Sequence, residues 1–195
     1  MAIATETIRE FVIAGHGNLE KVKSMLAAQP ELLNVPFYWS ETDPETALDG
    51  AAHVGNRAIA EYLLAQGAPL TFYAACTLGM TDKVREYLSQ TPTLAATPGV
   101  HNISALFHAA FSGSTELADL LAAHGGADSR ASLNHALHAA VNAGHLAMVN
   151  WLLAHGVTDV NSPNFEKKTP LQVALHRGHS EIADVLRAHG GSEAL

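Results

Sequence analysis

The chain has few of the residues that mark several large classes of protein. It contains a single cysteine, Cys76, which excludes an internal disulfide framework and suits a reducing cytoplasm. No apolar run reaches the roughly 18 residues that a membrane span needs. The first residues, MAIATETIRE, have no basic stretch leading into an apolar core, so they do not resemble a signal peptide. We therefore expect a cytoplasmic protein without a membrane partner.

Positive charge and catalytic signatures are also scarce. The 11 lysine and arginine residues are outnumbered by 19 aspartate and glutamate residues, and the formal net charge of −8 argues against binding nucleic acid through its phosphates. The sequence has no G-x-S-x-G, P-loop or H-E-x-x-H motif. These absences favour a protein that is not an enzyme and that needs no cofactor.

What the chain does contain is a short helical unit that recurs. In residues 169–190, TPLQVALHRGHSEIADVLRAHG, Thr169 and Pro170 begin a first helix and Gly178 ends it. A second helix with one apolar side follows, and Gly190 closes it. With the glycine between the two helices as an anchor, the sequence contains six copies of the unit. The anchors are Gly17, Gly55, Gly79, Gly113, Gly144 and Gly178.

The unit resembles the ankyrin repeat, whose pattern is TPLH-x-A…GH-x-E…LL-x-x-G. The resemblance implies an all-α ankyrin-repeat solenoid of about six stacked helix-turn-helix repeats, joined by short or irregular fingers. The resemblance covers nearly the whole chain, so we expect a single domain over residues 1–195. The chain is also similar to the short ankyrin-repeat proteins of bacteria. The expected repeats are 7–34, 44–70, 71–93, 102–128, 133–160 and 167–191.

The connection over residues 29–45, QPELLNVPFYWSETDPE, is the longest in the chain, and its three prolines exclude a regular helix. In the ankyrin family this connection is a β-hairpin finger. Its three adjacent aromatic residues cannot all point into one core, because side chains alternate in an extended chain. The next two anchors, Gly55 and Gly79, are only 24 residues apart. We therefore expect a gap in the row of fingers beside the aromatic one.

Twelve histidines suggest a metal site, but the repeat accounts for half of them. Six lie where the family pattern places histidine: at the start of a second helix, before a helix-ending glycine, or in the TPLH motif. These are His124, His138, His145, His155, His179 and His189. No His-Cys or His-carboxylate cluster has the local spacing of a zinc site. The sequence therefore predicts no metal ligands.

In the ankyrin family, the ends of the first helices and the fingers line the concave binding surface. The residues expected there in the middle repeats are unusual for a plain interaction surface, because a carboxylate and an imidazole lie beside aromatic side chains. Asp49 and His53 are four residues apart and so share one helix face. The candidate binding residues are Tyr38, Trp39, Asp49, His53, Tyr73, Phe107, His108, Phe111 and His176.

Two interpretations are open for this surface. In the first, it docks an unidentified protein partner, and its aromatic residues are the anchors. In the second, the aromatic finger and the gap beside it form a pocket for a small apolar or cationic ligand. If the protein is an enzyme, Asp49 would orient His53 as a general acid or base. We favour the first interpretation, a non-catalytic protein–protein interaction module that binds on its concave face.

Overall fold

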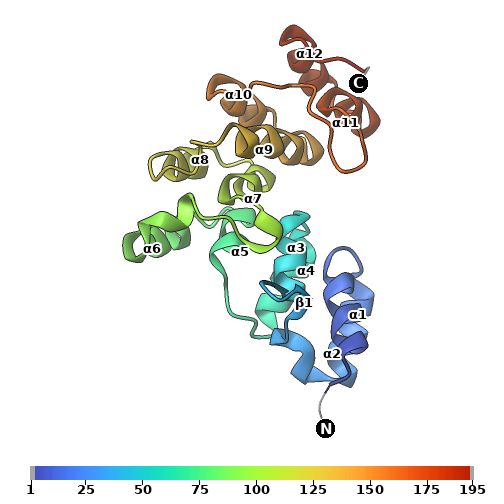
Figure 1. The fold of residues 1–195 in the computed structure, drawn as a ribbon. Helices are drawn as coiled ribbons and strands as arrows, with labels where there is room; N and C mark the ends of the chain where they lie inside the picture. The colour runs from blue at the N-terminus through green and yellow to red at the C-terminus, as the bar shows by residue number, and fades with distance from the viewer. Residues whose placement is uncertain (1–2, 194–195) are drawn as a thin grey trace.

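The structure, a computed structural model, describes residues 3–193. Within this range it contains twelve α-helices that follow one another as six pairs (Figure 1). The pairs are α1 (Thr5–Gly15) with α2 (Leu19–Ala28), α3 (Ala47–His53) with α4 (Arg57–Ala65), α5 (Phe72–Thr77) with α6 (Thr81–Gln90), α7 (Ala105–Ser112) with α8 (Thr115–Ala122), α9 (Arg130–Ala143) with α10 (Leu146–Ala154), and α11 (Pro170–Arg177) with α12 (Ser180–Ala188). The all-α class expected from the sequence is confirmed.

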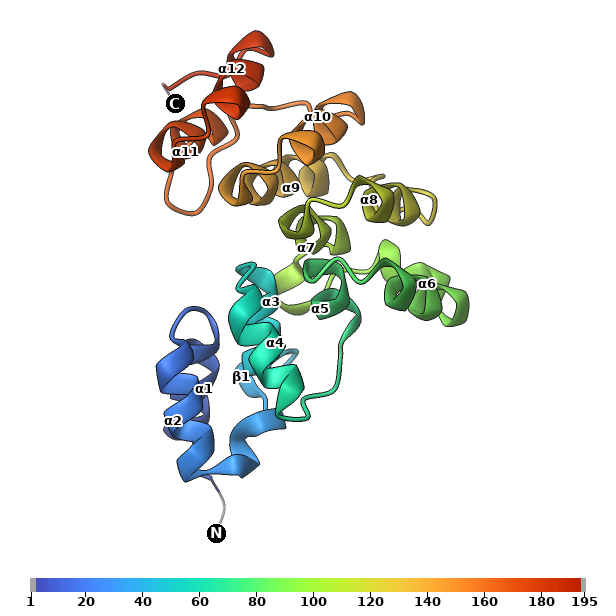
Figure 2. The same cartoon turned by 180° about the vertical axis from the view of Figure 1, so that it is seen from behind.

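The pairs stack side by side, so the molecule is elongated and its two termini lie at opposite ends (Figures 1 and 2). The first helices form an unbroken row, in which α1, α3, α5, α7, α9 and α11 each pack against the next. The second helices form a parallel row that is interrupted between α4 and α6, which lie apart in both views. The short connection between α4 and α5 therefore coincides with a break in the outer row.

The helix ends follow from local sequence. Thr169 accepts a hydrogen bond from the backbone N–H of Gln172, and the Gln172 side chain accepts one from Thr169, which completes a capping box at the start of α11. Gly113 ends α7 with φ of 73°, in the left-handed region that glycine enters without a steric penalty. A serine or threonine side chain caps the start of five of the six first helices, and a glycine with positive φ follows each of these five, which is why the repeat can be read from the sequence.

The core is built from small and branched apolar side chains at matching positions of each pair. All six residues in the fifth position after an anchor are buried: Val22, Ala60, Val84, Ala118, Val149 and Ala183. At the eighth position, Leu63, Leu121, Leu152 and Leu186 are fully buried, whereas Met25 and Tyr87 are partly exposed. Alanine is frequent between helices because its small side chain lets neighbouring pairs approach closely.

The connections hold little regular structure besides the aromatic finger. In the described residues the only strands are β1 (Phe37–Ser40) and β2 (Asp43–Glu45), which pair antiparallel in that finger. Three 3-10 helices also lie in connections: η1 (Pro30–Asn34), η2 (Pro92–Ala95) and η3 (Val100–Asn102). No strand lies between α4 and α5, and β2 contacts η3, which precedes α7. The hairpin thus connects the second helix pair to the loop before the fourth.

Candidate functional site

A cluster of ionisable side chains surrounds Glu45 at the base of the hairpin. Glu45 is the last residue of β2 and is 0% exposed. Its Oε1 atom lies 3.2 Å from Nε2 of His16 and 3.4 Å from Nδ1 of His53. Its Oε2 atom accepts a hydrogen bond from the indole N–H of Trp39 and lies 3.4 Å from Nε2 of His101. Three imidazoles from three separate parts of the chain therefore converge on one buried carboxylate.

Local structure fixes the two closest histidines. His16 follows α1, and its Nδ1 lies 3.0 Å from the carbonyl oxygen of Val12, which can only accept a hydrogen bond. The Nε2 atom of His16 is therefore turned toward the cluster, 2.9 Å from Nε2 of His53 at the end of α3. A Cβ at Gly50 would lie 2.9 Å from Cε1 of His16 and 3.3 Å from Oε1 of Glu45, so this glycine makes room for both side chains.

The ionisation of the cluster follows from burial and proximity. Burial alone would raise the pKa of Glu45, but the contact with His16 and the charges of His53 and His16 outweigh it and lower the pKa. The contact with Glu45 raises the pKa of His16. Burial lowers the pKa of His53 to about 4, against the opposing attraction of Glu45. At neutral pH the structure therefore favours an ionised Glu45 and a neutral His53.

A second carboxylate, that of Asp43, holds His101 in place. Its Oδ1 atom accepts the backbone N–H of His101 at 2.9 Å, and its Oδ2 atom lies 2.6 Å from Nδ1 of the same residue. His101 has φ of 56°, in the left-handed region that non-glycine residues rarely adopt. The two hydrogen bonds keep the imidazole directed toward Glu45.

Among residues 3–193, one group of side chains has donor atoms close enough to share a metal ion. The group is His16, Glu45 and His53, whose donor atoms all lie within 4.8 Å of one another. The sequence interpretation missed it because the three residues are not close in the chain. The available signals were weak: a glutamate directly before the helix-starting Thr46, and a histidine before Gly17 that the other copies lack.

Asp49 has a different role from the one expected of it. Its Oδ2 atom accepts the backbone N–H of Thr46 at 3.1 Å, and its own backbone N–H donates to the Thr46 hydroxyl oxygen at 3.2 Å, which forms a capping box at the start of α3. The Thr46 hydroxyl also donates to Oδ2 at 2.7 Å. Burial raises the pKa of Asp49 despite these hydrogen bonds. The described residues show no hydrogen bond or ion pair between Asp49 and His53, and Glu45 is the carboxylate that faces this imidazole. His53, expected at an exposed helix end, has a side chain only 9% exposed.

The expected aromatic residues are divided among three environments. Tyr38 is 58% exposed on the hairpin, and Trp39 is 40% exposed but packs edge-on against Phe37. Tyr73 donates its hydroxyl to the carbonyl of Thr97, and its ring covers the loop that leads to α7.

His108 is buried, contrary to the expectation that it faces a ligand. Its Nδ1 atom lies 2.9 Å from the carbonyl of Ser104, and burial lowers its pKa to about 4.

A groove of about 930 Å³ runs along the first helices from α3 to α11. It brings together four of the expected binding residues: His53, Phe107, Phe111 and His176. The rings of Phe107 and Phe111, both in its lining, meet edge to face with their centres 5.2 Å apart. Its other lining includes Phe165, which is 95% exposed in the loop before α11 and which the sequence interpretation did not single out. Tyr38, Trp39, Asp49, Tyr73 and His108 do not line it.

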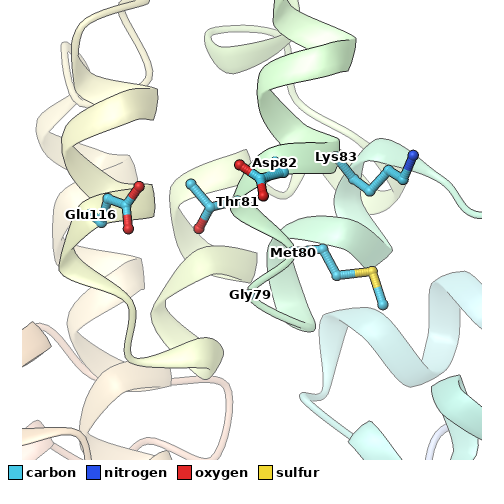
Figure 3. Close-up of a pocket in the computed structure, with 6 residues that line it drawn as sticks. All are labelled: Gly79, Met80, Thr81, Asp82, Lys83 and Glu116. Carbon is cyan, nitrogen blue, oxygen red and sulfur yellow. The ribbon is translucent and has the colours of Figure 1, made fainter.

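A second, smaller hollow lies at the start of α6 (Figure 3). Figure 3 shows Glu116 of α8 facing Thr81 and Asp82, while Met80 and Lys83 point away from them. Arg85 contacts both acids, at 2.6 Å from Asp82 and 3.3 Å from Glu116. These exposed acids are therefore already paired within the chain.

Comparison with known proteins identifies the repeat. A family profile for ankyrin repeats (three copies) matches residues 71–164 and 106–194, which together span more than half of the chain. The chain belongs to the ankyrin-repeat family. Among curated proteins, none matches it at a significant level.

Membership of the ankyrin-repeat family explains the fold and indicates the general class of function. The stacked helix pairs are the all-α ankyrin-repeat fold, and ankyrin repeats are generally protein–protein interaction modules. The matched residues include α5 to α12 and therefore most of the groove. Within residues 3–193, no helix is both long and apolar enough to cross a membrane.

Proposed function

We propose that this ankyrin-repeat protein is a non-catalytic module that binds a protein partner in the groove between α3 and α11, on the concave face. The observation that carries the proposal is the aromatic lining of the groove, which includes one strongly exposed ring. Phe107 and Phe111 offer a partly buried apolar surface, and Phe165 is almost fully exposed with no packing role to explain it. Aromatic side chains of this kind are the usual anchors of protein interfaces.

The charge of the groove indicates the chemistry of the partner. The chain as a whole is acidic, with a formal net charge of −8, but the groove is lined by Lys168, Arg177 and a single acid, Glu166. Lys168 and Glu166 form an ion pair at 2.8 Å, which leaves Arg177 as the uncompensated fixed charge of the lining. An extended segment that carries an apolar side chain and a carboxylate fits this surface.

The test is capture of a partner with matched variants of the groove. Phe165→Ala and Phe111→Ala should weaken capture most, and Arg177→Glu should weaken it through repulsion of the carboxylate. Phe165→Ala is the more specific of the two aromatic variants, because a side chain so exposed contributes little to the stability of the fold. Met80→Ala is the control, since Met80 is an exposed apolar residue outside the groove. Capture that survives the groove variants and fails with changes to the second helices would place the interface elsewhere.

The alternative, a small-ligand site or acid/base enzyme that uses Asp49 and His53, has weaker support. Asp49 is engaged by Thr46, and its substitution is expected to act on the helix cap. We expect Asp49→Asn to leave partner capture unchanged. Loss of a measurable turnover in Asp49→Asn or His53→Gln, with the fold and ligand affinity intact, would instead support the enzyme.

The cellular setting belongs to the same proposal. A cytoplasmic location in a bacterium is supported by the lone, fully buried Cys76 and by the resemblance to short bacterial ankyrin proteins.

A further inference from the structure

We propose that His16, Glu45 and His53 form a binding site for a divalent transition-metal ion, and that zinc fits the donors best. This inference does not depend on the groove or on the identity of any partner. It rests on the positions of the three donors, on their unmet hydrogen-bonding capacity and on the contacts that orient them.

The donors are close enough together to share an ion, and the separation of the His16 and Glu45 donors is that of two neighbouring ligands. Two donors that each lie about 2.1 Å from a metal, at angles of about 90–110°, are roughly 3.0–3.4 Å apart. Nε2 of His16 lies 3.2 Å from Oε1 of Glu45. His53 places Nε2 2.9 Å from Nε2 of His16 and Nδ1 3.4 Å from Oε1 of Glu45, and one of these two nitrogens would be the ligand. With one ligand atom from each residue, the three donor atoms all lie within 4.8 Å of one another. Two imidazoles and a carboxylate are a donor set that zinc uses in sites with an open fourth position.

The cluster lacks the protons to satisfy its own lone pairs. Nδ1 of His16 must carry a hydrogen to donate to Val12, so Nε2 of the neutral ring has only a lone pair. If the hydrogen of His53 is on Nε2, its Nδ1 lone pair faces the carboxylate. If the hydrogen is on Nδ1, two Nε2 lone pairs face each other at 2.9 Å. An added proton relieves this conflict, and so does a divalent cation, which accepts electron pairs from the carboxylate and from the imidazole nitrogens.

Two atoms of the cluster are buried without a hydrogen bond of normal geometry. They are Oε1 of Glu45 and Nδ1 of His53, and Glu45 is 0% exposed. A buried carboxylate oxygen with no donor is costly, so such atoms in a folded protein call for a specific explanation. Both atoms belong to residues of the proposed site.

The surrounding contacts are those that orient metal ligands. The carbonyl of Val12 fixes the tautomer of His16, and the indole of Trp39 holds the second oxygen of Glu45. His53 also lines the groove together with His101, so an ion bound here would be within reach of the groove. The ligands come from the end of α1, from β2 and from α3, and the ion would therefore join the hairpin to the first two helix pairs.

The experiment is a titration of the full chain with Zn²⁺, and separately with Co²⁺, after treatment with a chelator. We expect one ion per chain, with the visible absorption bands of Co²⁺ bound by nitrogen and oxygen. Loss of a residue that hydrogen-bonds to a metal ligand commonly weakens metal affinity about 10–100-fold. Loss of a ligand itself should therefore weaken the affinity at least about 100-fold. His16→Gln, His53→Gln and Glu45→Gln are the ligand variants, and circular dichroism verifies that each is folded.

Gly50→Ala tests the geometry without removing a ligand. Alanine favours a helix more than glycine does, so α3 should be retained, but the new methyl group would press on His16. We expect weaker binding with unchanged helix content. The matched controls are His176→Gln, an exposed histidine of the groove, and the triple variant His124→Gln, His155→Gln and His189→Gln, which should bind the ion like the parent chain.

Three results would overturn the proposal. The first is the absence of saturable binding of either ion to the parent chain. The second is binding that persists unchanged in all three ligand variants, which would indicate ordinary surface histidines. The third is binding that the controls abolish. Each outcome leaves the proposed interaction groove untouched, because partner capture is measured with different variants.

Discussion

At the scale of single residues, the stability of the protein depends on a few buried ionisable groups. Glu45 keeps its charge without solvent exposure because histidines and the Trp39 indole surround it. His108 is also a buried ionisable group, but unlike Glu45 it is uncharged. It is buried beside Tyr73 and Phe107 with one hydrogen bond to Ser104, and it stays neutral because burial lowers its pKa to about 4. Groups of this kind make stability depend on pH.

We predict that His108 destabilises the protein in mild acid. Its pKa is about 4 when folded and 6.5 in its ordinary state, so between these values the unfolded chain binds more protons and stability falls as pH falls. The shift corresponds to at most about 3 kcal/mol, lost gradually between pH 6.5 and pH 4. The measurement is urea unfolding of the parent chain and of His108→Asn, whose amide can keep the hydrogen bond to Ser104.

The difference between the two chains isolates His108, because His53 titrates in the same range and is present in both. The slope of stability against pH should be shallower in the variant below pH 6.5. Parallel curves would show that His108 is not buried in its neutral form.

At the scale of helices, each pair is too short to be stable alone and is stabilised by its neighbours. Helices of about ten residues are marginal in water, so burial between pairs must provide most of the free energy of folding. Leu121, Leu152 and Leu186 occupy the same position in consecutive pairs and are equally buried, at 0% exposed. Their surroundings differ, since α12 packs against α10 and α11 and ends the described stack.

We predict that Leu152→Ala and Leu121→Ala each lower the free energy of unfolding by ~2–5 kcal/mol, the range for a buried leucine that leaves a cavity. Leu186→Ala should cost less, because the last pair can relax into a cavity that helices on both sides would hold open. Denaturant unfolding of the three variants measures the losses. Equal losses would contradict the argument from stacking.

At the scale of the whole molecule, the two rows of helices are unequal. The first helices pack continuously, but the second helices separate between α4 and α6. The buried core divides near this point into one cluster that includes Phe11 and Leu63, a second around Val84, and a third over the last pairs. The hairpin spans the break, through the contact of Asp43 with His101.

We predict that the N-terminal part, α1 to α4, opens separately from α7 to α12. In a linear stack each interface contributes its own stability, and the interface without packed second helices should be the weakest. Hydrogen exchange in low denaturant should show two groups of amides with different opening free energies. Asp43→Ala, which removes the bridge, should lower the value for α1 to α4 more than the exposed control Asp82→Ala. One common opening of all twelve helices would refute the prediction.

The parts of the structure that the sequence predicted are those set by local rules. The anchor glycines, the Thr169–Gln172 cap and the buried fifth positions each depend on residues within a few places in the chain, so their spacing was enough to find them. Of the expected binding residues, Phe107, Phe111 and His176 lie in the groove for the same reason. They occupy helix positions that the repeat places on one face.

The sequence by itself therefore determined the family, the helix pairs and the apolar register, because ankyrin repeats encode each unit in about thirty residues. Only the tertiary structure decided which charged groups meet. Asp49 and His53 share a helix face, yet Asp49 is held by the helix cap at Thr46, and Glu45 takes its place beside His53. His16, Glu45 and His101 come together because the hairpin folds back over α1 and reaches the loop before α7. The position of the hairpin depends on contacts between segments that are distant in the chain, so the local spacing of residues could not predict it.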